Sequence, residues 1–136
     1  MPGVFRRRRP LPPSLVPAHE AFLRCAAHVD LAQRAMIRCV PSSPRSAALP
    51  LAVGAETVRV SLAAARDAMD AWRVPEVESS WQACLAALGT TVDGVDAAVA
   101  RAEATVELEV ALTAVQDLLD PLHAFVDAEA AFNALR

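Results

Sequence analysis

Apolar residues recur along this chain at alternating steps of three and four, a spacing that places their side chains on one side of an α-helix. The clearest series runs through the middle of the chain and consists of Trp81, Leu85, Leu88, Val92, Val95, Val99, Ala102 and Val106. Two upstream series share this spacing: Leu15, Ala18, Phe22, Cys25, Val29, Ala32, Met36 and Cys39, and then Leu51, Ala55, Val58, Leu62, Ala65, Met69 and Trp72. The pattern predicts helices that each bury one face against the others.

Prolines mark the ends of the first two predicted helices. The expected segments are a first helix from Ser14–Pro17 to Pro41, a linker over residues 41–50 and a second helix from about Pro50 to Arg73. Val74 should end the second helix, because a residue that precedes proline avoids the helical region. Pro75 can begin the next helix, and so short a connection predicts that the second and third helices are antiparallel neighbours.

The third series contains a conflict between local and periodic signals. Residues 89–91, Gly-Thr-Thr, resemble a helix end followed by a new start with a capping-box spacing to Asp93, yet the apolar series continues through them in phase. An unbroken helix to Asp120 would be about 70 Å long, which is too long for a domain of this size. We therefore predict a break or sharp kink at 89–91. A second position for a turn is 103–107, where the spacing slips without a helix-breaking residue.

The last helix is then expected from about Thr91 to Leu135. Its apolar series shifts phase near Leu108 and continues through Leu112, Val115, Leu119, Leu122 and Val126. Pro121 should kink this helix. Together the segments predict an all-α antiparallel bundle of about four helices, formed as a single domain over residues 15–136. The Arg- and Pro-rich residues 1–14 are expected to be a disordered tail.

Composition predicts a thin core. Apolar residues make up 54% of the chain, but many of them are alanine and only 4% of residues are aromatic. Alanine favours helix and fills little space, so the helices should approach closely. The 13 basic residues are all arginine, a usage typical of GC-rich coding DNA that favours a bacterial source.

Charge is divided unevenly along the chain. Residues 1–45 carry a formal charge of +6 and residues 46–136 one of −9. This asymmetry suggests either pairing of the first helix with the last or a basic tail for an acidic partner. The densest charge run, Arg6, Arg7, Arg8 and Arg9, could contact the phosphates of nucleic acid or an anionic membrane. A pI near 5.5 and the lack of an aromatic stacking platform favour a solvated tail instead.

Few residues of the chain could carry chemistry. The three cysteines have no paired spacing and are interpreted as buried, reduced structural residues: Cys25, Cys39 and Cys84. Cys25 with His28, and Asp120 with His123, share helix faces, but the Glu-x-x-His motif of di-iron bundles does not occur. We find no phosphate loop and no nucleophile elbow, and we expect no enzymatic activity, cofactor or metal.

Packing patterns therefore dominate the sequence, and we predict a non-enzymatic interaction or scaffold module that self-associates or binds a helical protein partner. Trp72 and Trp81 are expected in the core, or at the centre of an interface if they are exposed. The many acidic residues of the last helix are interpreted as a solvated face, with a docking face for a basic partner as the alternative.

Two other functions stay open at this point. One is an accessory protein that contacts nucleic acid or anionic membrane through Arg6–Arg9, and the other is a small-molecule or metal-binding bundle. We expect no transmembrane segment, because the longest uncharged run in the helical region, residues 79–92, is shorter than the roughly 20 apolar residues a span needs. The expected location is the cytoplasm.

Overall fold

The computed structural model describes residues 9–40 and 50–136, which form helices and connecting turns and contain no strand. The α-helices are α1 (Val16–Ile37), α2 (Leu51–Asp67), α3 (Glu78–Glu103), α4 (Leu108–Leu119) and α5 (Ala124–Asn133). A 3₁₀ turn, Asp120–His123, joins α4 to α5 and contains Pro121, which confirms the predicted kink. The molecule is thus a bundle of four long helical segments, and the predicted fold class is confirmed.

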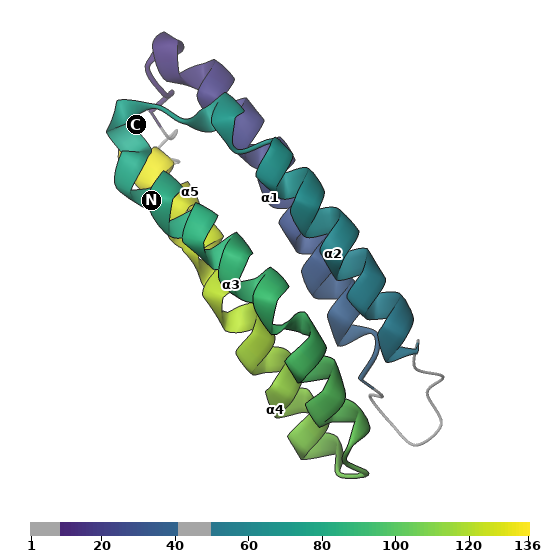
Figure 1. Cartoon of the computed structure of the whole chain (residues 1–136). Coiled ribbons are helices and arrows are strands. Elements are labelled where there is room, and N and C mark those ends of the chain that lie inside the picture. The colour runs from purple at the N-terminus through teal and green to yellow at the C-terminus, as the bar shows by residue number, and fades with distance from the viewer. Residues whose placement is uncertain (1–8, 41–49) are drawn as a thin grey trace, which may run out of the picture.

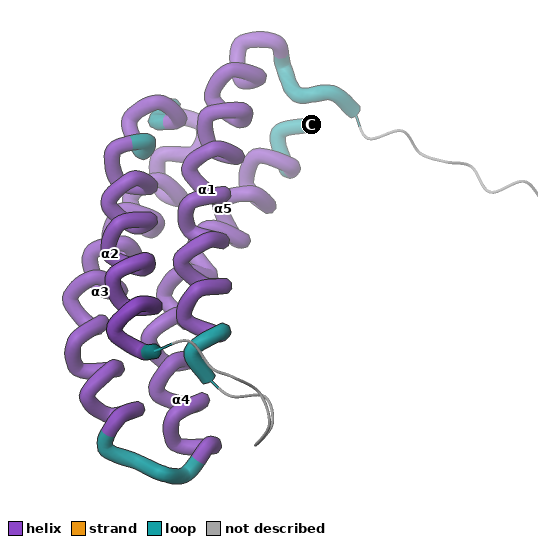
Figure 2. The backbone as a smooth tube through the Cα atoms, turned by 90° about the vertical axis from the view of Figure 1, so that its right-hand side faces the viewer, coloured by secondary structure: helices purple, strands orange, loops and turns teal. Residues whose placement is uncertain are grey.

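The helices form two antiparallel pairs that lie side by side (Figure 1). One pair is α1 with α2, and the other is α3 with the segment α4–α5. Figure 2 shows the short loop that joins α3 to α4 at one end of the bundle. α2 also packs on α3, so the two helices predicted to be antiparallel neighbours are in contact.

The apolar series predicted for the first two helices form the core between them. All eight members of the first series are buried, and so are all members of the second except the half-buried Leu51. The α-helical part of the second segment ends at Asp67, earlier than predicted. A 3₁₀ turn, Asp70–Trp72, follows and keeps Met69 and Trp72 buried.

The predicted break at residues 89–91 is wrong, because α3 runs unbroken from Glu78 to Glu103. Thr91 is fully buried in the middle of the helix, and a Cβ placed on Gly89 would meet no atom within 4 Å. Both residues are therefore accommodated within the continuous helix. The continuous apolar spacing outweighed the local stop signal, and each glycine costs only about 1 kcal/mol of helix propensity.

The turn occurs instead at the second position, residues 104–107. The backbone N–H of Glu107 donates to Thr105 Oγ1 at 3.1 Å, and Val106 is fully exposed. The last helical segment therefore begins at Leu108 and not near Thr91. A side-chain-to-backbone hydrogen bond of this kind stabilises a turn without glycine or proline.

Most aromatic side chains gather at one end of the bundle. Phe22 of α1 lies 5.0 Å from Trp72 and 5.3 Å from Phe132 of α5, measured between ring centroids. His19 packs 5.2 Å from Phe132, and Phe125 completes the cluster. The rest of the core consists mainly of alanine, valine and leucine, as the composition predicted.

Glycines allow close helix approach at two places in the bundle. A Cβ on Gly54 of α2 would overlap Cys39 Sγ and lie 3.3 Å from the Ala35 carbonyl oxygen. A Cβ on Gly94 of α3 would lie 3.3 Å from Leu118 of α4. The first contact joins α2 to the end of α1, and the second joins α3 to α4.

Candidate functional site

A hollow with a mainly apolar lining lies between α1 and α4–α5. The two central helices α2 and α3 pack on their neighbours over much of their length, whereas α1 touches α4 at few residues. The hollow has a volume of about 530 Å³, and we call it the α1–α4 groove. Its lining is Asp30, Gln33, Arg34 and Ile37 from α1, Leu112, Val115, Gln116 and Leu119 from α4, Asp120 and His123 from the 3₁₀ turn, and Val126 from α5.

The groove has an apolar floor and apolar walls. Val115 and Leu119 form the floor and are buried. Ile37, Leu112 and Val126 form the walls, with 55%, 37% and 60% of their surfaces exposed. Each wall residue comes from a different helix, so the groove exists only in the folded bundle.

The rim of the groove is polar and partly acidic. Arg34 pairs with Asp30 at 2.9 Å, and His123 Nδ1 lies 3.5 Å from Asp127. Asp120 has no ion-pair partner within the part of the chain that the structure describes. A cationic group of a bound molecule could therefore pair with Asp120.

Interhelical ion pairs do not join the first helix to the last in the described residues. Arg59 of α2 pairs with Asp96 of α3, and Arg101 of α3 pairs with Asp117 of α4 at 3.9 Å. Both pairs are exposed and contribute little to stability. The charge asymmetry of the sequence is therefore not explained by pairing within the bundle.

The two tryptophans lie in the core, which was the first of the two positions expected for them; the other was the centre of an interface. Trp72 is fully buried, and Trp81 is 4% exposed. Trp81 Nε1 donates to the Met69 carbonyl oxygen at 2.8 Å, and the Arg73 guanidinium lies 4.0 Å from its ring centroid. An interface centred on these rings would require the bundle to open.

The cysteines are buried free thiols, as predicted. Cys25 Sγ donates to the Ala65 carbonyl oxygen at 3.2 Å, and Cys84 Sγ donates to the Ala124 carbonyl oxygen at 3.4 Å. Burial raises the pKa of Cys25 and raises that of Cys84 to about 12. A thiol that stays protonated at neutral pH is a poor nucleophile and a poor metal ligand.

The two candidate metal-ligand pairs do not converge. Asp120 and His123 lie on the rim of the groove, whereas Cys25 is in the core between α1 and α2. Residues 9–40 and 50–136 contain no group of three His, Cys, Asp or Glu side chains able to hold a metal ion.

The arginine run can be placed only in part. Arg6, Arg7 and Arg8 lie outside the described residues, and Arg9 is exposed. Closer to the bundle, Leu11 is buried and Pro13–Leu15 form a 3₁₀ turn. A role of the four arginines with an anionic partner therefore stays a prediction.

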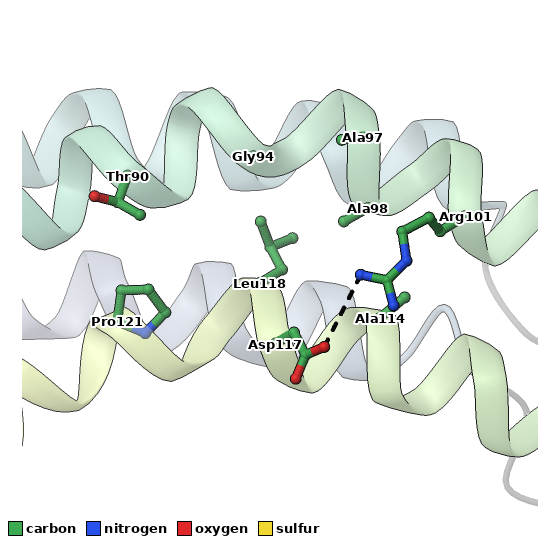
Figure 3. A pocket seen from close by; sticks show the side chains of 9 residues that line it. All are labelled: Thr90, Gly94, Ala97, Ala98, Arg101, Ala114, Asp117, Leu118 and Pro121. Atoms are coloured by element: carbon green, nitrogen blue, oxygen red, sulfur yellow. Dashed lines mark ion pairs between the residues drawn. The ribbon is translucent and has the colours of Figure 1, made fainter.

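A smaller hollow of about 200 Å³ lies between α3 and α4 (Figure 3). Its walls are mostly small residues, including Gly94, Ala97 and Ala98, and the Arg101–Asp117 ion pair crosses one end. Leu118 points into the space between the helices from α4. We interpret this hollow as a packing defect between small side chains, because it offers little room and few polar groups.

One segment, Pro75–Glu103, is long and apolar enough to cross a membrane by length and composition. Core helices of water-soluble proteins pass the same test, and α3 packs on α2, α4 and α5. The segment is therefore weak support for a membrane location.

Sequence reasoning missed the groove as a site, although it named some of its residues. The apolar spacing predicts Leu112, Val115, Leu119 and Val126 in the core of the last helix, but Leu112 and Val126 are exposed. Ile37 lies off the buried series of α1, as do Leu23 and Leu31. Large aliphatic residues outside a helix's buried series are the signal that could have indicated a binding surface.

Comparisons with known proteins add no relative: no family model, no curated protein and no solved structure matches this chain.

Proposed function

We propose that this protein is a non-enzymatic interaction module that binds an amphipathic helix of another protein in the α1–α4 groove. The observation that supports it is the groove itself, with its buried floor and its exposed aliphatic walls. A helix laid between α1 and α4 would cover the side on which the bundle is least packed. Binding of an amphipathic helix in an apolar groove is a common mode of peptide recognition.

The rim indicates the chemistry of the partner. The carboxylate of Asp120 is free of an ion-pair partner among the described residues, and Asp117 and Asp127 lie on the same helical segment. A partner helix with apolar residues on one face and arginine or lysine beside them would satisfy both floor and rim. This assigns part of the acidic face of the last segment to docking.

A small-molecule site is the weaker interpretation of the same groove. Sites for small ligands bury most of the ligand surface. Here Ile37 and Val126 are more than half exposed, so the groove leaves much of its wall open to solvent. An elongated apolar partner fits this shape better than a compact one.

The test measures binding of a fluorescent synthetic amphipathic peptide of about 20 residues, long enough to form helix, with leucines on one face and arginines on the flanks. We expect saturable binding that Val126→Asp weakens roughly tenfold or more, because a carboxylate would be forced against apolar surface. Val60→Asp is the matched control, since Val60 on α2 is equally exposed and lies outside the groove.

Two results would contradict the proposal. One is equal loss of binding in Val126→Asp and Val60→Asp, which would indicate nonspecific adsorption. The other is equal affinity for a peptide of the same composition whose leucines are spread around the helix. Asp120→Asn should weaken the peptide with arginine flanks and leave one with glutamine flanks unchanged.

A further inference from the structure

The outward face of α1 has a pattern of size and charge that is symmetric about its centre. This face is opposite the buried series of α1, and all its residues are exposed. We call it the outer α1 face; it consists of Val16, Glu20, Leu23, Arg24, Ala27, Asp30, Leu31, Arg34 and Arg38. Leu23 and Leu31 have 44% and 55% of their surfaces exposed, large values for aliphatic side chains.

The symmetry is centred on Ala27. Leu23 and Leu31 lie equally far from it on either side and are identical. Glu20 corresponds in the same way to Arg34, with opposite charge. Arg24 corresponds to Asp30, again with opposite charge. These four charges therefore cancel in pairs, and the smallest side chain lies at the centre. The fifth charged residue of the face, Arg38, lies at its end and corresponds to the uncharged Val16.

We propose that the outer α1 face binds the same face of a second copy of this chain, with the two α1 helices antiparallel. In a twofold antiparallel pair, each residue faces the residue equally far on the other side of the centre. Leu23 then contacts Leu31 of the second copy, and Glu20 faces Arg34 of the second copy. Ala27 lies at the twofold axis, where its small side chain allows the helix axes to come within about 8–10 Å.

Charge complementarity identifies the second copy as the occupant. Within one chain, Arg34 pairs with Asp30 at 2.9 Å. In the dimer, Arg34 is placed between its own Asp30 and Glu20 of the second copy, and Glu20 lies between Arg34 of the second copy and its own Arg24. Charges of alternating sign along the seam favour this register over a parallel one, which would place like charges opposite each other.

The proposed dimer is weak and depends on concentration. One pair of helices buries less surface than the roughly 1,200–2,000 Å² of a stable interface. The outer α1 face and the α1–α4 groove share only Asp30 and Arg34. Self-association and helix binding are therefore separate proposals, and the failure of one leaves the other standing.

Sedimentation equilibrium of the whole chain with two charge reversals tests the dimer. Wild-type protein should be a monomer–dimer mixture at high concentration and low salt. Glu20→Arg and Arg34→Glu each place like charges opposite each other twice per dimer, so each should weaken association by about tenfold or more. An equimolar mixture of the two variants should associate again, because every opposed pair then has opposite charges.

Arg66→Glu is the control, because Arg66 is exposed on α2 and lies outside the outer α1 face. It should leave the dimer unchanged, and circular dichroism checks that all variants remain folded. A wild-type chain that stays monomeric at every concentration would overturn the proposal. So would a dimer that both reversals leave intact, or variants that do not associate when mixed. The peptide-binding assay on Glu20→Arg should be unaffected, which separates this outcome from the groove proposal.

Discussion

At the scale of single residues, the helical glycines of this bundle differ in what surrounds them. Gly54 faces Cys39 at the contact of α1 with α2, and Gly89 faces open space on α3. Neither has a positive φ angle. Only the surroundings of the missing side chain therefore decide what a substitution does.

Replacing each of these glycines with alanine should have opposite effects on stability. Gly89→Ala should raise the free energy of unfolding by about 1 kcal/mol, because alanine favours helix and its methyl group meets nothing. Gly54→Ala should lower it by about 1–3 kcal/mol, because the methyl group would overlap Cys39 Sγ. Urea unfolding of both variants measures the difference. An equal effect in both would show that propensity alone, and not helix approach, governs Gly54.

The buried thiol of Cys84 should make stability fall at high pH. Burial raises its pKa from 9.0 to about 12, with smaller contributions from Cys25 and Asp127. The unfolded thiol ionises first, so the group does not change stability below its unfolded pKa and opposes folding as pH rises from there toward the folded pKa. Urea unfolding between about pH 7 and pH 10.5 should therefore show a smaller loss in Cys84→Ala than in wild type. Parallel pH profiles would contradict this.

At the scale of elements, the sequence predicted helix identity better than helix ends. The first apolar series was predicted correctly along its whole length, because its members share one side of the helix and that side faces the core. The C-terminal end of α3 was misplaced because Gly-Thr-Thr at residues 89–91 matches a stop signal that tertiary packing overrides. In the actual turn at 104–107 the Thr105 hydroxyl accepts a hydrogen bond from the Glu107 N–H, and only the slip in apolar spacing, without glycine or proline, marks this turn in the sequence.

Within α3, the buried hydroxyl of Thr91 allows a test of how an unpaired polar group affects stability. Its side chain is fully buried, and Oγ1 has no hydrogen-bond partner in the described residues. Thr91→Val keeps the shape and removes an unpaired hydroxyl, so it should raise the free energy of unfolding by about 1 kcal/mol. Thr90→Val is the control, because Thr90 is exposed on the same helix and should change little. A loss of stability in Thr91→Val would mean that the hydroxyl is bonded in solution.

At the scale of the whole molecule, the bundle was predictable and the groove was not. Periodicity specifies which face of each helix is buried, but the distance between α1 and α4 depends on how all the helices pack together. Val126 illustrates this limit: it continues the apolar series of the last segment, yet it is 60% exposed because no helix of residues 9–40 and 50–136 covers it. The sequence shows that Leu23 and Leu31 lie off the buried series of α1. Their symmetry about Ala27 becomes relevant only because the structure leaves both side chains exposed.

The aromatic cluster should contribute more stability than any comparable part of the bundle. Phe132 is fully buried and contacts Phe22, Trp72 and His19. Phe132→Ala should lower the free energy of unfolding by about 3–5 kcal/mol, because it leaves a large cavity among rigid rings. Thermal and urea unfolding measure this, with the exposed Val126→Ala as a control that should change little. A loss below about 1 kcal/mol would show that α5 is not held by these rings.

The clustering of aromatic rings at one end should also make local stability differ between the two ends of the bundle. The opposite end, around the loop between α3 and α4, is held by alanine and valine contacts and by exposed ion pairs. Amide hydrogens of α4 near that loop should therefore exchange with deuterium sooner than those of α1 near Phe22, since local opening there breaks fewer large contacts. Local opening at the loop end would let the bundle accommodate a bulky bound molecule there, while the aromatic cluster keeps the helices packed at the other end.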